Sequence, residues 1–579
     1  MPETSAEKTS CDVLVIGAGP TGLSMACEAL RHGLSCRIVD AHDSVGASSP
    51  GQILHTRTLE VFEQMGVIDE FLKVGRTLHL LSMYTPDLRR LFHFTVGEFD
   101  SAYPYMLSVS QHDTERILTA RLRGYGVEVE RPFACQELIQ DDGAVVVRGR
   151  QAPDGPLLAI RAAWVVGCDG GHSFVRQALE IPWQGNSYRE RVLLADVKLA
   201  WPFFHANDEV FGFASEHGAL GVFPLPAADR YRLLALDAGL APTIENFQFL
   251  LDSRGPAGAR IVEASWLHEY TIQCRLAAAF RRGRVFLAGD AAHTLSPTTA
   301  QGMNLGIQDA FNLGWKLSLV QAGIGRDVLL DSYEAERMPV AAELLKTSDL
   351  ATRGLNDLLT LGGVRAQGLR NSLLELVSEL GLVRRSVSRN LSMLDLGYPN
   401  SPIVAQHHAS RLTEPPADGQ PPLPDPPRVA ISLRQWLDFG HGPAPGLRAV
   451  DGRLRALPGD TVHHLFSLLH SGQHLLLLFA GSAETEEAYH RLAALGAQVH
   501  ARHQRSIRVA MIEASRPDDS WGRPGWEGAL FLDENGSLHQ AYGARAECVY
   551  LLRPDGHVAF RSQPADPLKV QEYLDRIWL

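Results

Sequence analysis

The first forty residues alternate between short apolar runs and turns. One apolar run begins at Cys11 and ends in a glycine-rich turn, and a second covers residues 36–39. Between them, Leu23, Ala26 and Leu30 stand three or four positions apart, which is the spacing of residues on one face of a helix. Short apolar runs bounded by turn residues are typical of buried strands. The pattern predicts a strand, a helix and a second strand in succession.

The middle of the chain carries two more buried strands with an alternating segment between them. The runs 163–168 and 284–288 end in Asp-Gly and Gly-Asp turns, as strands that lead to the ligand-binding edge of an α/β sheet do. Residues 188–266 alternate between apolar and polar positions, which predicts an inserted, mostly antiparallel sheet. From residue 307 to about residue 390 the spacing becomes helical.

A proline-rich segment separates the last part of the chain from the rest. Residues 411–427 contain the run EPPADGQPPLPDPP, in which repeated prolines exclude both a helix and a central strand. The following residues, 428–579, show apolar strands at 474–480, 549–552 and 557–561 and a closing helix, and they resemble a thioredoxin-like α/β domain. Residues 481–484 read Gly-Ser-Ala-Glu where a working thioredoxin carries its cysteine pair, so we expect no redox activity there.

Composition and charge narrow the classes of partner. The formal net charge of -12 has no compensating basic tract, which argues against binding to nucleic acid or to an anionic membrane. No apolar run reaches the roughly 18 residues of a membrane span, and residues 1–10 have no signal-peptide pattern, so we expect a disordered tail and a cytoplasmic protein. Seven scattered cysteines without a C-x-x-C spacing predict reduced thiols and no metal site.

The glycine turn after the first strand has the form of a dinucleotide-binding loop. Gly17 permits the tight turn, Gly19 allows close backbone approach to a pyrophosphate, and Gly22 allows the helix to pack on the strand. Pro20 and Thr21 lie in the same turn, at the start of the helix. Asp40 ends the second strand, where a carboxylate can accept hydrogen bonds from ribose hydroxyls. This loop alone fits NAD as well as FAD.

A second motif, in residues 285–316, favours FAD. Gly289 and Asp290 stand at a strand end, where a carboxylate can bind ribityl hydroxyls. Pro297 stiffens the loop that follows and is expected beside the flavin ring. A helix then opens at Gly302, Met303 and Asn304, where backbone N–H groups can face the O2 end of a reduced flavin.

With these motifs the chain resembles the class A flavoprotein monooxygenases, the family of para-hydroxybenzoate hydroxylase and phenol hydroxylase. The run Gly289 to His293, with Pro297, matches the family's second flavin motif, and Asp169-Gly170 with Arg176 matches its third. Two less specific matches are Arg57, expected beside the cofactor, and Gln111, expected near the flavin. Gly51-Gln52 departs from the pattern, because many relatives carry Pro-Arg or Arg-Ala there.

The resemblance implies an α/β protein with a Rossmann-like FAD-binding domain, comprising residues 11–187 and 267–410 with a helical extension. An inserted antiparallel substrate-binding sheet would occupy residues 188–266, and the thioredoxin-like domain residues 428–579. NADPH or NADH would reduce the FAD as a transient co-substrate, and a C4a-hydroperoxyflavin formed with O2 would hydroxylate a phenolic or polycyclic aromatic substrate. The chain has no second dinucleotide fingerprint, and the two nicotinamide coenzymes are not separated by sequence.

The sequence identifies the substrate-binding residues less clearly than the cofactor-binding residues. An aromatic pocket and an ordinary sheet core are equally good interpretations of Tyr188, Phe211, Phe213 and Phe223, whereas Pro297 is expected at the site. No residue is assigned as a catalytic base, and His293 is set aside for that role. His217 and Arg191 could steer a phenol or a carboxylate, but isolated polar residues in a strand or loop are more often solvent-facing, so they receive no catalytic role.

Two other functions remain open. One is Baeyer-Villiger oxygenation of a polyketide-like ketone, and the other is a non-catalytic flavin-binding assembly protein. A halogenase is disfavoured because its Trp-x-Trp-x-Ile-Pro motif is missing. The C-terminal domain is expected to be structural, with homodimerisation as one candidate role.

Overall fold

A computed structural model describes much of the chain. It covers residues 10–44, 51–97, 100–141, 143–200, 208–237, 239–297, 300–359, 388–408, 432–459, 461–481, 486–514, 526 and 528–579, with backbone only at 187–190, 237 and 350–359. These residues form two compact units. The first comprises Met1–Gly314 and Arg337–Asp395, and the second Trp315–Glu336 and Leu396–Leu579. The proline-rich segment 411–427 and the Ser-Ala-Glu of residues 482–484 lie outside the described residues.

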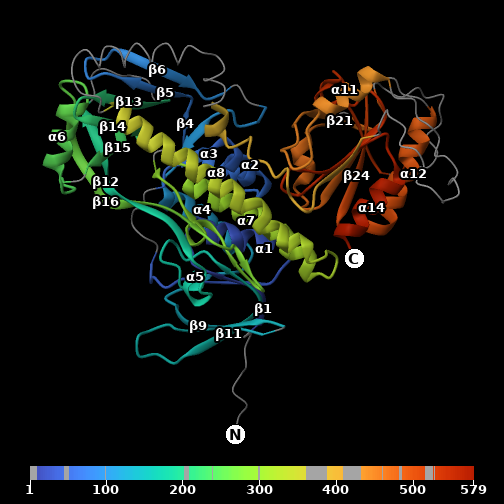
Figure 1. Ribbon diagram of the computed structural model, residues 1–579, viewed down its shortest axis with the longest axis horizontal. Helices are drawn as coiled ribbons and strands as arrows, with labels where there is room; N and C mark the ends of the chain where they lie inside the picture. The colour runs from blue at the N-terminus through green and yellow to red at the C-terminus, as the bar shows by residue number, and fades with distance from the viewer. Residues whose placement is uncertain are drawn as a thin grey trace, which may run out of the picture. The chain divides into compact units, whose positions relative to one another are not determined.

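The first sheet of unit one contains the expected strand–helix–strand (Figure 1). Its strands run in the order β17-β18-β11-β1-β2-β8. β1 (Ser10–Ile16) is parallel to β2 (Cys36–Val39) and β11 (Leu158–Gly167), and β11 is parallel to β18 (Val285–Leu287). The carboxyl ends of β1, β11 and β18 therefore meet at one edge, and each is followed by one of the three sequence motifs.

Helices cover this sheet, and the residues at their first turns are ones that favour the start of a helix. α1 (Pro20–Arg31) starts with a proline, whose fixed φ suits the first helical turn, and is buried continuously from Gly22 to Ala29. It packs against α4 (Gln111–Gly124), which Ser110 caps by accepting the N–H of Asp113. The other helices are α2 (Thr56–Gln64), α3 (Ile68–Val74), α5 (Phe174–Ala178), α7 (Gly302–Gln321) and α8 (Val328–Leu359). The other strands of the sheet are β8 (Val129–Glu130), β17 (Arg281–Arg282) and the antiparallel pair β9 (Ala134–Gln140) and β10 (Val145–Arg150), which joins it beside β11.

The second sheet has eight strands in the order β19-β16-β12-β15-β14-β13-β5-β6. All neighbours are antiparallel except β13 and β5. The expected region supplies most of it, but β5 and β6 come from residues 80–95 and the sheet extends to residue 294. Its strands are β12 (Trp183–Ala200), β13 (Glu209–Ser215), β14 (Gly218–Pro224), β15 (Arg230–Asp237), β16 (Arg260–Ala277), β19 (His293–Thr294), β5 (Leu80–Tyr84) and β6 (Arg90–Thr95).

The two faces of this sheet have different coverings. On one face, Leu193, Phe211 and Phe213 pack with Phe247 of α6 (Ile244–Arg254) in a buried core. On the other, Leu194, Leu234, Trp266 and Tyr270 lie in a cluster that includes Leu345 of α8. Since side chains alternate along a strand, the second face is the one available to the FAD-binding domain. A small third sheet joins β3 (Ile53–Leu54), β7 (Met106–Ser108) and β4 (Arg76–Leu78).

Unit two is built on a mixed sheet of order β20-β27-β26-β23-β24-β25-β21-β22. β23 (His474–Phe479) is wholly buried, with parallel β24 (Ile507–Glu513) on one side and antiparallel β26 (Cys548–Leu552) on the other. The other elements are β20 (Ala405–His408), β21 (Arg453–Leu457), β22 (Val462–His464), β25 (Ala529–Leu532), β27 (Val558–Gln563), α11 (Leu433–His441), α12 (Glu486–His503), α13 (Ser537–Ala541) and α14 (Pro567–Ile577).

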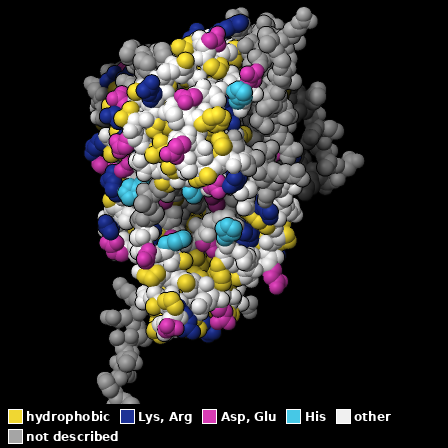
Figure 2. Space-filling view, turned by 90° about the vertical axis from the view of Figure 1, so that its left-hand side faces the viewer, with side chains coloured by type: hydrophobic (Ala, Val, Ile, Leu, Met, Phe, Trp, Pro, Cys, Tyr) yellow, Lys and Arg dark blue, Asp and Glu magenta, His cyan; other side chains and the backbone are white. Residues whose placement is uncertain are grey.

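The cysteines, the helix composition and the surface charges are further features of the described residues. None of the seven cysteines forms a disulfide, and five of them are buried. None of the helices in the described ranges is long and apolar enough to cross a membrane, and those ranges contain no cluster of metal-ligating side chains. On the face shown in Figure 2, acidic and basic side chains are interspersed over the described part of the surface.

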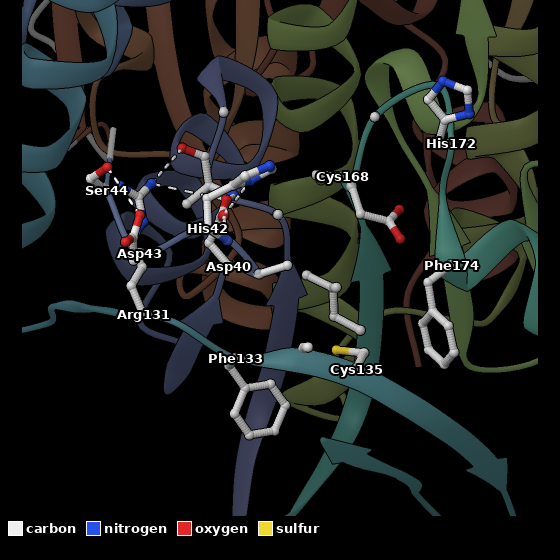
Figure 3. A pocket seen from close by; sticks show the side chains of 18 of the residues that line it. Asp40, His42, Asp43, Ser44, Arg131, Phe133, Cys135, Cys168, His172 and Phe174 are labelled. Atoms are coloured by element: carbon white, nitrogen blue, oxygen red, sulfur yellow. Dashed lines mark hydrogen bonds and ion pairs between the residues drawn. The ribbon is translucent and has the colours of Figure 1, made fainter. Parts of the chain in front are cut away.

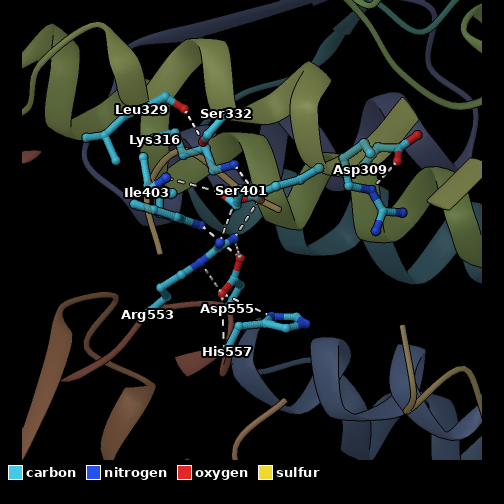
Figure 4. A network of polar contacts seen from close by, with 12 residues as sticks. Asp309, Lys316, Leu329, Ser332, Ser401, Ile403, Arg553, Asp555 and His557 are labelled. Atoms are coloured by element: carbon cyan, nitrogen blue, oxygen red, sulfur yellow. Dashed lines mark hydrogen bonds and ion pairs between the residues drawn. The ribbon is translucent and has the colours of Figure 1, made fainter. Parts of the chain in front are cut away.

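A network of buried charges holds unit two together (Figure 4). Glu336 accepts hydrogen bonds from Arg553 (2.6 and 2.9 Å), from Lys316 (2.7 Å) and from Ser401 (2.6 Å), and Arg553 also pairs with Asp555. Glu336, Lys316 and Arg553 are almost completely buried. Burial alone would raise the pKa of Glu336, but the charges of Arg553 and Lys316 lower it from 4.5 to about 2.

The Glu336→Gln variant is predicted to destabilise unit two, because it leaves two buried cations without their shared anion. The free energy of unfolding should fall by about 3–5 kcal/mol at neutral pH, measured by chemical denaturation. The wild-type protein should lose this contribution as the pH falls from 4.5 towards 2, and the variant should lack that pH dependence. Glu572→Gln, in an exposed pair with Lys569, is the control and should leave stability unchanged. Equal stability of the wild type and Glu336→Gln would show that the network contributes nothing.

Candidate cofactor site and active site

Two adjoining cavities of about 630 and 320 Å³ lie at the sheet edge where β1, β11 and β18 end. Both are lined by Gly19, Cys168 and Gly170, so they form one groove. Most of the expected cofactor residues line it: Gly17, Gly19, Pro20, Thr21, Asp40, Gln111, Asp169, Asp290, Pro297, Gly302 and Met303. The lining residues do not include Gly22, Arg57, Gly289 or Asn304.

Asp40 is one of the side chains that line the larger cavity (Figure 3). One carboxylate oxygen of Asp40 accepts the N–H of Ala18 (2.7 Å), and the other accepts the N–H of His42 (2.8 Å). Arg131 lies 3.9 Å from the carboxylate and donates to the carbonyl of Ala18 (3.2 Å). The sequence did not single out Arg131, which follows the short strand β8 and carries no motif of its own.

The glycine loop joins the two cavities. A Cβ on Gly17 would stand 2.3 Å from the carbonyl oxygen of Cys168, and one on Gly22 would stand 1.9 Å from that of Gly17. Gly19 has no protein atom within 4 Å of its Cβ position and no side chain caps the helix that it precedes. The first N–H groups of α1 therefore remain available to an anion such as a pyrophosphate.

The Asp-Gly motif after β11 carries an unpaired carboxylate oxygen. Asp169 Oδ2 accepts the N–H of Val175 (3.0 Å), whereas Oδ1 is buried and has no hydrogen-bond partner in the described structure. Burial raises the pKa of Asp169. Arg176 donates to the carbonyls of Gly171 (2.7 Å) and Ala291 (3.0 Å), so it ties this loop to the Gly-Asp loop after β18.

The smaller cavity contains the Gly-Asp loop and the start of α7. Asp290 projects into it, and desolvation raises the pKa of its carboxyl. Pro297, Gly302 and Met303 line the same cavity. Asn304 has another role, because it accepts the N–H of His55 (2.9 Å) and donates to the carbonyl of Ile53 (2.8 Å).

Of the two less specific matches, only Gln111 lines the groove. Arg57 is buried, is not a lining residue, and pairs with Glu60 (2.8 Å). Gln111 lines the cavity and donates to Glu115 (2.8 Å).

The unusual pair Gly51-Gln52 has a packing explanation. A Cβ on Gly51 would lie 2.7 Å from Gln111 Oε1 and 3.1 Å from Met303 Sδ. Gln52 is buried and donates to Ser108 Oγ (2.9 Å) and to the carbonyl of Pro224 (3.0 Å). Pro224 ends β14, so Gln52 joins the small cavity to the second sheet.

The expected aromatic substrate residues separate into two groups. Phe211 and Phe213 are fully buried in the core beneath α6, on the face that points away from the groove. Phe223 packs on the other face, in a cluster with Ile53 and Ala300, which both line the small cavity. The side chain of Tyr188 lies outside the described residues.

A row of side chains beside Phe223 was not anticipated. Strand register places Phe223, Arg232, Asp196 and Trp266 in one row across β14, β15, β12 and β16. Arg232 forms a two-point ion pair with Asp196 (2.6 and 2.9 Å), and its guanidinium lies 5.0 Å from the centre of the Trp266 ring. The alternation Trp-x-His-x-Tyr at 266–270 was the available signal, because it places three stacked rings on one face.

Comparisons with known proteins identify the family. The model for the FAD binding domain matches residues 10–348. The chain is 31% identical to 6-methylpretetramide 4-monooxygenase of Streptomyces rimosus, over 95% of this chain and 90% of that protein. It is 36% identical to pentachlorophenol 4-monooxygenase of Sphingobium chlorophenolicum, over 58% of this chain but only 63% of that protein's length. The solved structure of the anhydrotetracycline hydroxylase OxyS from Streptomyces rimosus superposes with a TM-score of 0.70 at 28% identity and covers 98% of this chain and 99% of that one.

The chain is a class A flavoprotein monooxygenase. The chemical groups that line the groove of this monooxygenase fit the parts of FAD. Asp40 and Arg131 stand at the end that suits the adenosine ribose, the open backbone at Gly19 suits the pyrophosphate, and Asp290 with the start of α7 suits the ribityl chain and the ring. The buried, unpaired Oδ1 of Asp169 supplies a further acceptor in the groove.

Gly19→Ala should separate cofactor binding from folding. The added methyl meets no protein atom, so the melting temperature of the apoprotein should stay unchanged, but the methyl takes the space through which a pyrophosphate approaches the backbone. The dissociation constant for FAD, measured by quenching of FAD fluorescence, should rise by about ten-fold or more, a loss of at least one hydrogen bond to a charged group. Gly124→Ala, at the end of α4 with equally open surroundings, is the control. An unchanged dissociation constant in Gly19→Ala would place the pyrophosphate elsewhere.

Proposed function

We propose that this monooxygenase uses NADH or NADPH and O2 to hydroxylate a phenolic or polycyclic aromatic substrate held between the small cavity and the second face of the antiparallel sheet. The observation that supports this most directly is the position of Phe223, which packs with the cavity-lining residues Ile53 and Ala300. The names of the relatives agree, since the Sphingobium protein is a monooxygenase of pentachlorophenol and the Streptomyces protein is a monooxygenase of 6-methylpretetramide.

Bound FAD would carry electrons from the nicotinamide coenzyme to O2 and so activate the oxygen, and the chain would position the substrate and exclude water. Phe223 and its apolar neighbours Ile53 and Ala300 offer a flat surface to an aromatic ring and exclude water from it. Pro297 restricts the backbone conformation of the loop beside the expected flavin ring. Tyr270 ends the row of stacked rings that begins at Trp266, and its phenol, whose pKa burial raises, can donate a hydrogen bond to a substrate oxygen.

The proposal gives unit two a structural role. The succession β23, α12, β24, followed by the antiparallel pair β26 and β27 and the closing helix α14, supports a thioredoxin-like domain over residues 428–579. We propose that this domain acts structurally, with homodimerisation as its candidate role, and that the protein works in the cytoplasm, where thiols stay reduced, as the seven cysteines outside any disulfide would suit.

The reaction itself is tested by coenzyme oxidation with a panel of monocyclic phenols and hydroxylated polycyclic aromatics. Oxygen uptake and product mass are recorded together, and at least one member should gain one oxygen atom for each coenzyme oxidised. NMR of that product should show a new ring hydroxyl, whereas a ring-expanded ester would indicate Baeyer-Villiger chemistry instead. Hydrogen peroxide as the only product across both groups would contradict hydroxylation of these substrates.

Phe223→Ala and Phe211→Ala should change different properties, KM in the first variant and stability in the second. Phe223→Ala removes a wall of the proposed substrate site, so KM for an accepted substrate should rise about ten-fold, the loss of one aromatic contact, with little change in melting temperature. Phe211→Ala empties a core position, so the free energy of unfolding should fall by about 3–5 kcal/mol with KM unchanged. Phe249→Ala, 60% exposed on α6, is the neutral control. The same KM in wild type and Phe223→Ala would remove Phe223 from the substrate site.

A further inference from the structure

Three buried side chains lie directly behind the Gly-Asp loop, outside both cavity linings. Asp309 of α7 is in the middle, and Figure 4 shows it with the guanidinium beside it. Asp309 Oδ2 accepts the backbone N–H of Gly289 (3.0 Å) and lies 2.6 Å from His293 Nε2. Asp309 Oδ1 accepts a hydrogen bond from Arg337 Nε (2.7 Å). The side chains of His293, Asp309 and Arg337 have no solvent exposure.

The hydrogen bonds define the state of His293. Asp309 is an ionised carboxylate, because a backbone N–H and a guanidinium both donate to it, so His293 must donate its Nε2 proton to the same group. His293 Nδ1 is buried and has no hydrogen-bond partner in the described ranges. His293 therefore serves as a donor to Asp309 and does not face the groove.

The loop that Asp309 holds has almost no freedom to move. Gly289 has a φ of +61°, and a Cβ there would lie 2.5 Å from Thr21 Oγ1. Gly306 of α7 approaches the same hydroxyl, at 2.2 Å for its Cβ position. The loop is thus confined between α1 and α7, and Asp309 binds it at Gly289 and at His293, one residue before Asp290 and three residues after it.

We propose that Asp309 is a positioning residue that sets the direction of the Asp290 carboxylate towards the ribityl chain of FAD, acting through Gly289 and His293. Asp309 touches neither cavity, so its effect on the cofactor is indirect. Arg337 holds the other oxygen of Asp309 and also donates to the carbonyl of Leu305 (3.1 Å), which fixes the carboxylate on α7. His293 transmits the position and takes no part in proton transfer.

The first experiment separates positioning from bulk packing at His293. His293→Phe keeps a ring but loses the donor, and the dissociation constant for FAD should rise about ten-fold, as expected for one lost hydrogen bond to a charged group. His293→Gln keeps a donor that reaches Asp309, so it should restore binding to within about three-fold of the wild type. The visible circular dichroism of the bound flavin should change in His293→Phe and return in His293→Gln. Equal binding and equal spectra in all three proteins would overturn the proposal.

The second experiment compares two buried carboxylates. Asp309→Asn and Glu28→Gln each remove a fully buried charge paired with an arginine, but Glu28 and Arg31 lie on α1 and do not contact the Gly-Asp loop. Both variants should lower the melting temperature of the apoprotein. Only Asp309→Asn should also weaken FAD binding and alter the flavin spectrum. If both variants lower stability and neither changes FAD binding, Asp309 is a core ion pair and nothing more; if Asp309→Asn does not fold, the His293 pair decides.

Discussion

The architecture of this monooxygenase depends on the close approach of backbone segments at one sheet edge. Gly17 lies against the carbonyl of Cys168, and Gly289 lies against Thr21. Any side chain at these glycines would separate the ends of β1, β11 and β18, and the groove would divide into unconnected parts. The first role of these glycines is therefore in packing. Their close contacts let the two cavities adjoin in one groove. The open side at Gly19 then remains for the cofactor.

The same edge also connects the groove to the proposed substrate site. Gln52 joins the small cavity to the end of β14, and Phe223, the residue before Pro224, packs against Ile53 and Ala300 of the cavity lining. The antiparallel sheet can present this face because α6 and a core that includes Phe211 and Phe213 occupy the other. Buried charges recur as fixing points within each unit: Asp309 behind the Gly-Asp loop, and Glu336 in unit two.

Sequence reasoning succeeded where backbone geometry decides the residue type. Gly17, Gly22 and Gly289 admit no other residue, so their spacing predicted the strand–helix–strand and the order of the three motifs. It could not assign Phe211 and Phe223 to different faces, because the strand limits that set their alternation were unknown. Arg131 and Asp309 were missed for a related reason: each is placed by tertiary contacts with segments far away in the sequence, Ala18 and Gly289. Likewise, β5 and β6 join the sheet from residues 80–95, where no motif marks them.

The measurement that tests the central claim most directly is an experimental structure of the FAD complex. The adenosine ribose should lie at Asp40 and Arg131, the pyrophosphate at the N-terminus of α1, and the flavin ring beside Pro297 and Met303 with one face towards Phe223. A reversed cofactor, or a flavin ring outside the cavity that these residues line, would contradict the account.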